Sequence, residues 1–237
     1  MMKSGIKGSI ARLIDRFDRK LAINPLAKLL QKENIDCILD VGANKGQYGL
    51  QVRGKGYTGR IESFEPLSQA FGVLRERSSN DPEWNIHQLA LGNEQSTKEI
   101  NISSNQPSSS FRDLDPNFKS SQVDLTFVGK ESVKIDQLDN VFESVSGSAS
   151  NVYLKIDTQG YEMDVLKGAV RSMNRIKLVQ LETALVPNYS GEALIEDVIS
   201  MMREHNFAPW WIIDGFKNKM TPQMFQVDVF FRNQDFE

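Results

Sequence analysis

The residues best suited to chemistry in this 237-residue chain lie in two strand–turn–helix segments. In the first, CILDVGANKGQYG, an apolar run contains Asp40 near its end, and Gly42 and Gly46 frame the turn before the next helix. Gly42 permits a tight turn and a close approach between the backbone and a ligand. Ligands of open α/β sheets bind beyond the carboxyl ends of the strands, so this turn is a candidate binding site.

The acids around this turn indicate which ligand it suits. The dinucleotide fingerprint needs G-x-G-x-x-G, whereas the spacing here is G-x-x-x-G, and Asp40 before the turn would repel a pyrophosphate. Asp40 suits the ammonium and sulfonium groups of S-adenosylmethionine. Glu65 closes the second expected strand, in RIESFEP, where a carboxylate accepts hydrogen bonds from ribose hydroxyls. An incidental strand–turn–helix is the structural alternative.

The second segment, VYLKIDTQGYEMDVLKGA, brings further charges to a strand end. Lys155 and Asp157 are two residues apart and share one face of a strand, and Glu182 closes the following strand. Charges are rarely buried without partners, which favours a functional role for Asp157. Glu162 has a structural alternative as a helix cap, and Lys155 has one as the partner of Asp157.

These side chains predict a way to activate a hydroxyl group. Asp157 or Glu182 is the candidate base, and Lys155 would stabilise the developing oxyanion or tune the carboxylates. If Asp157 and Glu182 converge, a divalent cation between them is an alternative way to polarise the hydroxyl, although two or three oxygens are few ligands for such an ion. His87 and His205 are expected to be structural. Asp228, inside the apolar run FQVDVFF, is a further candidate.

Alternating apolar runs and amphipathic helices predict a mostly parallel sheet with helices on both faces. The expected strands are Cys37–Val41, Arg60–Phe64, Asn85–Leu89, Val152–Ile156, Lys177–Leu181, Ala208–Ile213 and Phe225–Phe231. The expected helices are Gln47–Lys55, Leu67–Asn80, Ile135–Val145, Glu162–Met173 and Gly191–Asn206. The last two strands have no helix between them, so we expect a terminal antiparallel pair. Residues 35–237 should form a single domain, preceded by a helical extension over residues 1–34.

Three regions outside the two turns are expected to contact the molecule that carries the reacting hydroxyl group. Apolar residues from Ile6 to Leu21 recur at helical spacing beside basic residues, which predicts a helix packed on the domain or on a partner subunit, as in a homodimer. A membrane-surface helix or a lid over the active site is the alternative, disfavoured because Asp15 and Asp18 dilute the basic face. The polar loop Ser103–Ser121 carries residues that suit a sugar or polyol. Trp211 follows Trp210 on a strand, so the two side chains should point to opposite faces. The candidate substrate residues are Ser110, Phe111, Arg112 and Trp211.

Composition narrows the alternatives. A net charge of −3 argues against broad electrostatic binding to nucleic acid, so no DNA partner is expected. One cysteine, Cys37, excludes a disulfide framework and a cysteine-rich zinc site. No apolar run approaches the ~20 residues of a membrane span, so we expect no stable membrane insertion. The N-terminal residues do not resemble a signal peptide, and a cytoplasmic location is the default.

The ordered motifs resemble those of the FkbM-type methyltransferases from about Ile35 to Arg232. The matching stretches are LDVGANKGQY, FEP, the Ala90-Leu91-Gly92 step, VKIDQLD, LKIDTQGYEMDVLKGA, QLE and QVDVFF. The resemblance implies a Rossmann-like class I methyltransferase fold, with an α/β sheet of seven strands in the order 3-2-1-4-5-7-6. It also implies an S-adenosylmethionine-dependent O-methyltransferase, acting on a small-molecule or glycan acceptor such as a sugar or a polyketide-like natural product.

Carried over by position, the resemblance predicts where the cofactor binds. Asp157 would face the transferring methyl group, and Glu65 would hold the ribose. The methionine portion would lie near Tyr48, and the adenine near Gln88 to Leu91. The position before Glu162 is small in this family but is Tyr161 here, which alters the expected substrate shape. The full predicted cofactor set is Asp40, Gly42, Ala43, Asn44, Gly46, Tyr48, Glu65, Pro66, Gln88, Leu89, Ala90 and Asp157.

Three other functions remain as alternatives at this stage. A ribose 2′-O-methyltransferase of RNA would also use a lysine–carboxylate set such as Lys155, Asp157 and Glu182. A methyltransferase-like module that binds without turnover is the second, and an NAD-dependent dehydrogenase, disfavoured by Asp40, is the third. Amino methylation of nucleic acid is disfavoured because DPNF at Asp115–Phe118 lies before the fourth strand and lacks a second proline.

Overall fold

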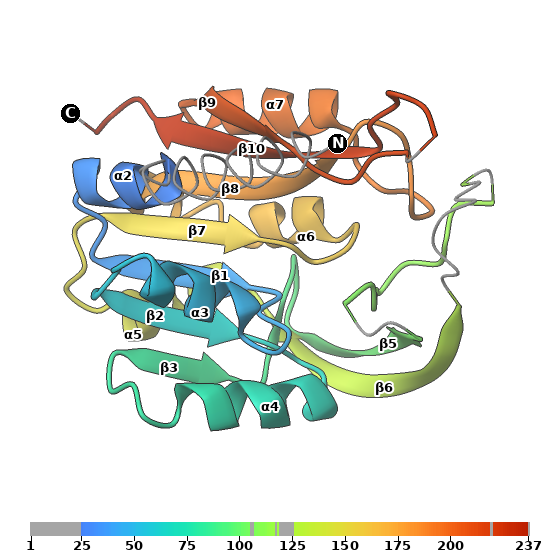
Figure 1. The fold of residues 1–237 in the computed structure, drawn as a ribbon, viewed down its shortest axis with the longest axis horizontal. Coiled ribbons are helices and arrows are strands. Elements are labelled where there is room, and N and C mark those ends of the chain that lie inside the picture. Colours follow the sequence, from blue (N-terminus) through green and yellow to red (C-terminus); the bar gives the residue numbers. More distant parts are fainter. Residues whose placement is uncertain (1–24, 105–106, 117, 119–125, 219, 237) are drawn as a thin grey trace, which may run out of the picture.

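A computed structural model describes residues 25–236 of the chain, apart from 105–106, 117, 119–125 and 219. A seven-stranded sheet forms the centre, and helices cover both of its faces (Figure 1). The predicted helix between Ile6 and Leu21 lies outside the described residues.

The central sheet has the strand order that the resemblance implies. Its neighbours run β3-β2-β1-β7-β8-β10-β9, which is 3-2-1-4-5-7-6 when only the strands of this sheet are counted along the chain. β10 is antiparallel to both β8 and β9, and the other pairs are parallel, so the predicted terminal antiparallel pair is confirmed. The strands are β1 (Cys37–Val41), β2 (Arg60–Phe64), β3 (Trp84–His87), β7 (Val152–Ile156), β8 (Ile176–Ala184), β9 (Phe207–Asp214) and β10 (Gln226–Asn233).

The helices divide between the two faces of the sheet. Leucines of α2 and residues of α3 and α4 pack on one face, together with Ile38 and Tyr153. Residues of α5, α6 and α7 pack on the other, with Leu39 and Leu154. Because β1 and β7 are buried on both faces, all five residues of each strand are buried. The helices are α2 (Pro25–Lys32), α3 (Gln47–Gly54), α4 (Ser68–Ser78), α5 (Leu138–Ser146), α6 (Glu162–Lys167) and α7 (Ile195–Glu204), with a 3₁₀ turn, η1 (Met173–Arg175).

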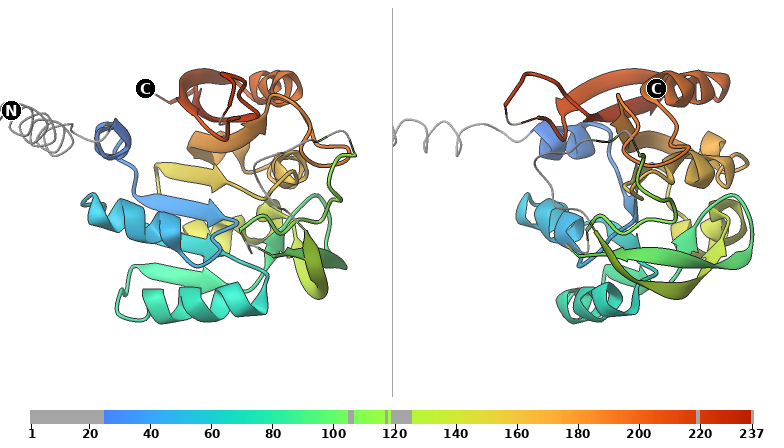
Figure 2. Two further views of the ribbon diagram at one scale, coloured as in Figure 1. Left: turned by 45° about the vertical axis from the view of Figure 1, so that its right-hand side comes forward. Right: turned by 90° about the vertical axis from the view of Figure 1, so that its right-hand side faces the viewer.

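A second, three-stranded sheet stands where the sequence predicted a loop and the start of a helix. It consists of β4 (Ala90–Leu91), β5 (Ser96–Ser103) and β6 (Phe127–Asp136), in the order β4-β6-β5. It lies beyond the carboxyl ends of the central strands (Figure 2). The predicted helix start at Ile135 is therefore wrong: Ile135 is a buried strand residue paired with Ser96, and α5 begins at Leu138.

Two predicted helices are shorter than expected for local reasons. α6 ends at Lys167 and is followed by turns from Gly168, the cap residue, where a side chain would meet the Gly92 carbonyl oxygen. α7 begins only at Ile195, after turns around Ser190. In the described part of the chain, no helix has the length and apolar character that crossing a membrane requires.

Candidate active site

The turn after β1 closes against the neighbouring strand ends. The backbone nitrogens of Gly42 and Ala43 donate to the carbonyl oxygen of Phe64 at 3.1 and 3.0 Å, which ties β1 to β2. Gly42 has φ +77°, and a Cβ there would lie 1.9 Å from the backbone oxygen of Asp157. A residue with a side chain therefore cannot replace Gly42 without moving β1 from β7. The structure thus gives Gly42 a close approach to the backbone after β7, whereas the predicted close approach to a ligand stays a prediction.

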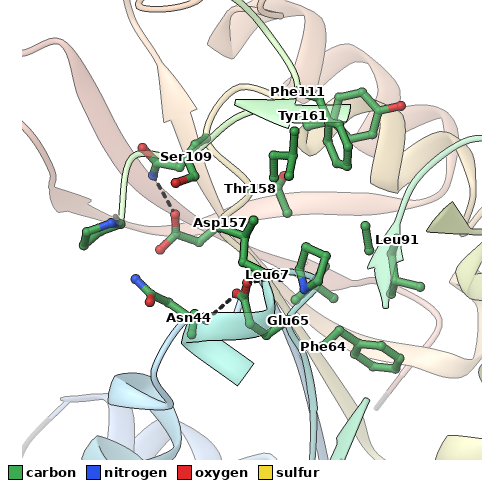
Figure 3. Close-up of a pocket in the computed structure, with 18 of the residues that line it drawn as sticks. Asn44, Phe64, Glu65, Leu67, Leu91, Ser109, Phe111, Asp157, Thr158 and Tyr161 are labelled. Atoms are coloured by element: carbon green, nitrogen blue, oxygen red, sulfur yellow. Dashed lines mark hydrogen bonds between the residues drawn. The ribbon is translucent and has the colours of Figure 1, made fainter. Parts of the chain in front are cut away.

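Glu65 is held in one orientation by the backbone around it. Its two carboxylate oxygens accept hydrogen bonds from the backbone nitrogens of Asn44 and Leu67, each at 2.8 Å (Figure 3). Burial raises the pKa of Glu65 to about 7, against the lowering effect of these two bonds. A carboxylate accepts more than two hydrogen bonds, so Glu65 still has acceptor capacity toward the pocket.

Lys155 is the charged centre of the sheet face beneath the site. Its Nζ lies 3.2 Å from Asp40 Oδ1 and 3.4 Å from Asp157 Oδ2. Burial opposes the charge of Lys155, but Asp40 and Asp157 outweigh burial and raise its pKa above the ordinary value. The amine is therefore protonated and is no general base. Asp40 is fully buried beside Ser63 and lines neither the first nor the second cavity described below, so the structure does not offer it the predicted direct contact with a cofactor.

The first cavity runs from the turn after β1 toward the small sheet (Figure 3). One end is polar and includes Asn44, Asp157 and Thr158. The other end is apolar and is lined by Leu67, Leu89, Ala90, Leu91, Ile100 and Ile102. Glu65 and Pro66 also line this cavity. The cavity therefore offers polar groups at one end and a mostly aliphatic slot, which Glu131 borders, at the other.

Five predicted cofactor residues do not line the first cavity. Asp40 is buried in β1, and Ala43 lines the second cavity described below. Gly46 packs against Leu74 and Trp84, where a Cβ would come within 2.8 Å of Leu74 Cδ1. Gln88 donates from Nε2 to Ser68 Oγ at 3.0 Å. Tyr48 also lines the second cavity.

This second cavity, of about 670 Å³, lies over the sheet face between α2 and α3. Lys155, Gln180 and Asp228 line it, and Trp211 and Phe230 supply aromatic walls. A hydrogen-bonded row runs under it: Tyr48 donates to Tyr153 at 3.0 Å, Tyr153 donates to Gln180 Oε1, and Gln180 donates to Asp228 at 2.9 Å. This combination of amides, charges and aromatic rings suits a polar organic molecule with several hydroxyl groups.

Asp157 borders both cavities, and a residue that we did not predict fixes its position. Gln159 Nε2 donates to Asp157 Oδ1 at 2.9 Å and to Glu182 Oε2 at 3.0 Å, and its Oε1 accepts from Tyr189 at 3.0 Å. An amide thus stands between the two carboxylates that we considered for a divalent cation. In the described chain, no group of three or more His, Cys, Asp or Glu side chains is placed to hold a metal. The left-handed φ of +56° at Gln159 was not foreseeable from its residue type.

Glu182 lies apart from the other predicted catalytic groups. It lines a third cavity with Asn188, Phe216 and Gln226, on the far side of Gln159 from Asp157. Burial and, next, the charge of Asp157 raise its pKa well above the ordinary value. Of the lysine–carboxylate set expected for a ribose 2′-O-methyltransferase, Lys155 and Asp157 therefore lie together, and Glu182 is separated from them by Gln159.

The loop before β6 is fixed by contacts that its residue types did not reveal. Arg112 Nε donates to the Gly160 carbonyl oxygen at 2.6 Å, and its guanidinium pairs with Asp164 at 2.8 Å. Ser110 is buried and donates to the Gln159 carbonyl oxygen at 2.6 Å. These contacts give Arg112 and Ser110 structural tasks in place of the predicted contact with substrate. Phe111 does line the first cavity, where its ring packs 4.8 Å from that of Tyr161.

The expectation that Trp210 and Trp211 point to opposite faces is wrong. The register of β9 against β10 shifts between Phe230 and Phe231, so Trp210 is an extra residue and the alternation of side chains is interrupted. Both tryptophans line one groove beside α2, where Lys32 lies 5.6 Å from the Trp210 ring centroid. Trp211 stacks on Phe230 at 4.7 Å, and it also reaches the second cavity.

The strand order, the glycine turn after β1 and the acid after β2 define a Rossmann-like methyltransferase fold. Among solved structures, magnesium protoporphyrin IX methyltransferase from Synechocystis PCC 6803, with bound S-adenosylmethionine, matches at a TM-score of 0.50 and 7% identity, over 99% of this chain and 86% of that one. TehB from Haemophilus influenzae matches at 0.49 and 7%, over 87% and 60%. No curated protein matches the sequence significantly.

The family follows from the sequence. The model of the methyltransferase FkbM domain matches residues 40–209, which include the second strand–turn–helix segment and the first one from Asp40 onward. The chain belongs to this family, as the resemblance predicted. Its sheet and its two predicted turns are thus those of an S-adenosylmethionine-dependent methyltransferase.

Proposed function

We propose that the protein is an O-methyltransferase that transfers the methyl group of S-adenosylmethionine to a hydroxyl of a sugar, a glycan or a polyketide-like natural product. The observation that carries this proposal is the position of Asp157 between two cavities. In this proposal the first cavity would take the donor and the second a hydroxylated acceptor. A reacting hydroxyl at their boundary would lie beside a carboxylate.

The residues around the first cavity fit the donor molecule. When bound, S-adenosylmethionine supplies an activated methyl group on a sulfonium sulfur. Glu65 would accept the ribose hydroxyls, since its carboxylate is already oriented by two backbone nitrogens. Gly42 and Asn44 would hold the methionine portion, and the apolar slot would take the base.

The chemistry left to the protein is orientation and removal of a proton. In the proposed reaction the carbon–sulfur bond breaks as a carbon–oxygen bond forms, and the hydroxyl proton passes to Asp157. A carboxylate is a moderate base, so we expect most of the rate to come from alignment in a water-poor site. Lys155, protonated and 3.4 Å from Asp157, would stabilise negative charge that develops on the acceptor oxygen.

Transfer of a labelled methyl group from S-adenosylmethionine to a panel of methyl glycosides, oligosaccharides and polyketide macrolides tests the proposal. We expect methyl ethers as products, and a loss of turnover of about 100-fold or more in Asp157→Asn. Affinity for S-adenosylhomocysteine should stay within about threefold of wild type in that variant, because Asp157 contributes to the proton step. Asp214→Asn, at the exposed end of β9, is the matched control.

Methyl transfer to nitrogen or carbon, or full activity of Asp157→Asn, would contradict the proposal. A preference for RNA over the hydroxylated small molecules would favour the ribose 2′-O-methyltransferase alternative. Binding of the donor without transfer to any acceptor class would favour the non-catalytic module.

A further inference from the structure

The apolar end of the first cavity contains a carboxylate that the family motifs do not include. Glu131 lies on β6 and lines the cavity with Ile100 and Ile102 of β5. Glu131 pairs directly with Ile100 in the sheet register, so both side chains lie on the same face of the small sheet. Of the described residues that line this cavity, three are carboxylates: Asp157, Glu65 and Glu131. Glu65 and Glu131 are both bonded at the start of α4, to the backbone nitrogens of Leu67 and Ser68.

The surrounding hydrogen bonds hold Glu131 with one oxygen free. Its Oε1 accepts from the backbone nitrogen of Ser68 at 3.0 Å and from Ser68 Oγ at 2.5 Å. Gln88 Nε2 in turn donates to Ser68 Oγ at 3.0 Å. Oε2 accepts no hydrogen bond from the residues that the structure describes. The carboxylate is therefore oriented by the start of α4 while half of its acceptor capacity remains unused.

The donor's shape brings its base to this place. If the ribose is held at Glu65 and the sulfonium lies near Asp157, the base extends in the opposite direction, into the slot of Leu67, Leu89 and Ile100. A purine buries its flat faces against aliphatic side chains and needs a partner only at its polar edge. Adenine presents an exocyclic amine at that edge, which is a hydrogen-bond donor.

We propose that Glu131 recognises the adenine of the methyl donor by accepting a hydrogen bond from this amine at Oε2. The inference rests on the proposed function, because it assumes that the first cavity holds the donor. It gives the small sheet a role in cofactor specificity: β5 supplies apolar side chains to the adenine pocket, and β6 supplies the Glu131 carboxylate that recognises the adenine amine.

Calorimetry with two ligands tests this assignment without an acceptor. The ligands are S-adenosylhomocysteine and its analogue in which purine, with hydrogen in place of the amine, replaces adenine. Each is titrated into wild type, Glu131→Ala and Glu131→Gln. Glu99→Ala is the matched control, since Glu99 lies on the same sheet, is exposed and pairs with Lys130 at 3.5 Å.

We expect wild type and Glu99→Ala to bind the adenine compound roughly tenfold or more tightly than the purine analogue, as a hydrogen bond to a charged group allows. In Glu131→Ala this preference should fall to about twofold or less. Glu131→Gln keeps an acceptor for Ser68 and should keep part of the preference. A purely structural role as a cap for α4 would lower the affinity for both ligands equally.

An unchanged preference in Glu131→Ala would overturn the inference and leave the proposed function intact. Equal weakening of both ligands would overturn it as well, in favour of the capping role. If wild type binds neither ligand, the proposed function itself fails, and the inference falls with it.

Discussion

Replacing Gly42 with alanine should separate the two strands that form the site. The added Cβ would lie 1.9 Å from the Asp157 backbone oxygen, and contacts of this kind are not tolerated below 3.0 Å, so the strands must part by about 3.0 − 1.9 = 1.1 Å. The left-handed φ of +77° costs a residue with a side chain about 1–2 kcal/mol. Forced expansion of a packed region costs about 1–3 kcal/mol more. We therefore expect the free energy of unfolding to fall by about 2–5 kcal/mol.

The consequence for function follows from the same displacement. The turn that carries Gly42 and Asn44, which we propose holds the methionine portion, would shift in the first cavity, and affinity for S-adenosylhomocysteine should fall by at least about tenfold. Urea denaturation and calorimetry measure the two effects. Gly72→Ala is the control: Gly72 lies inside α4 with no atom near the added Cβ, and the change should stabilise the protein by about 0.5–1 kcal/mol. A Gly42→Ala protein with wild-type stability and affinity would refute the reasoning.

Three further predictions concern stability and reactivity. Burial raises the pKa of both Glu65 and Glu162 from 4.5 to about 7, so between these pH values the folded protein binds more protons than the unfolded chain, and its free energy of unfolding should decrease as pH rises. In urea titrations at several pH values, Glu162→Gln should make this dependence on pH less steep. An unchanged dependence would contradict the raised pKa of Glu162. Arg112→Ala should lower the free energy of unfolding in urea by about 1–3 kcal/mol, because the guanidinium bonds Gly160 and Asp164. The control Arg175→Ala removes an exposed ion pair with Glu143 and should lower it by only about 0–1 kcal/mol. Equal losses in the two variants would count against a structural role for Arg112. Burial also raises the pKa of Cys37 to about 11, and a thiol reagent should label it only after unfolding; rapid labelling of the native protein would show that the β1 core opens.

The central sheet was predictable because its strands are short apolar runs that end in turn residues. Cys37–Val41, Arg60–Phe64 and Val152–Ile156 begin and end in the structure where the sequence placed them. β1 and β7 are buried on both faces, so nearly every position in them is apolar and the single charge in each stands out. Lys155 stood out in this way, and the structure shows it paired with Asp40 across β1 and β7.

The small sheet escaped prediction because it is largely exposed. β5 reads STKEINIS, and its first residues face solvent, so the strand carries no apolar run and little alternation. Ile135 has helical spacing with later apolar residues, but its burial comes from pairing within the sheet. The local pattern of apolar residues cannot distinguish a helix from a strand in this region, because the contacts that decide it are made by residues far apart in sequence.

The site was predictable at its strand ends and not in its loops. Glu65 and Asp157 follow β2 and β7 directly, so the parallel sheet brings them to one edge. Arg112 and Gln159 take their roles from partners fixed only by the tertiary fold, and the bulge that turns Trp210 toward α2 depends on the register of β10. Residue type alone gave Arg112 a substrate role, because a loop arginine has no partner that the sequence shows.

The most direct test of the methyltransferase assignment is the affinity for S-adenosylhomocysteine at pH 8, where Glu65 is ionised, in wild type and in Glu65→Ala. Glu83→Ala, an exposed change just before β3, serves as the control. We predict micromolar binding by wild type and by the control, and a loss of roughly tenfold to a hundredfold in Glu65→Ala. Equal affinity in Glu65→Ala, or no binding by the wild-type protein, would contradict the central claim that this cavity holds the methyl donor.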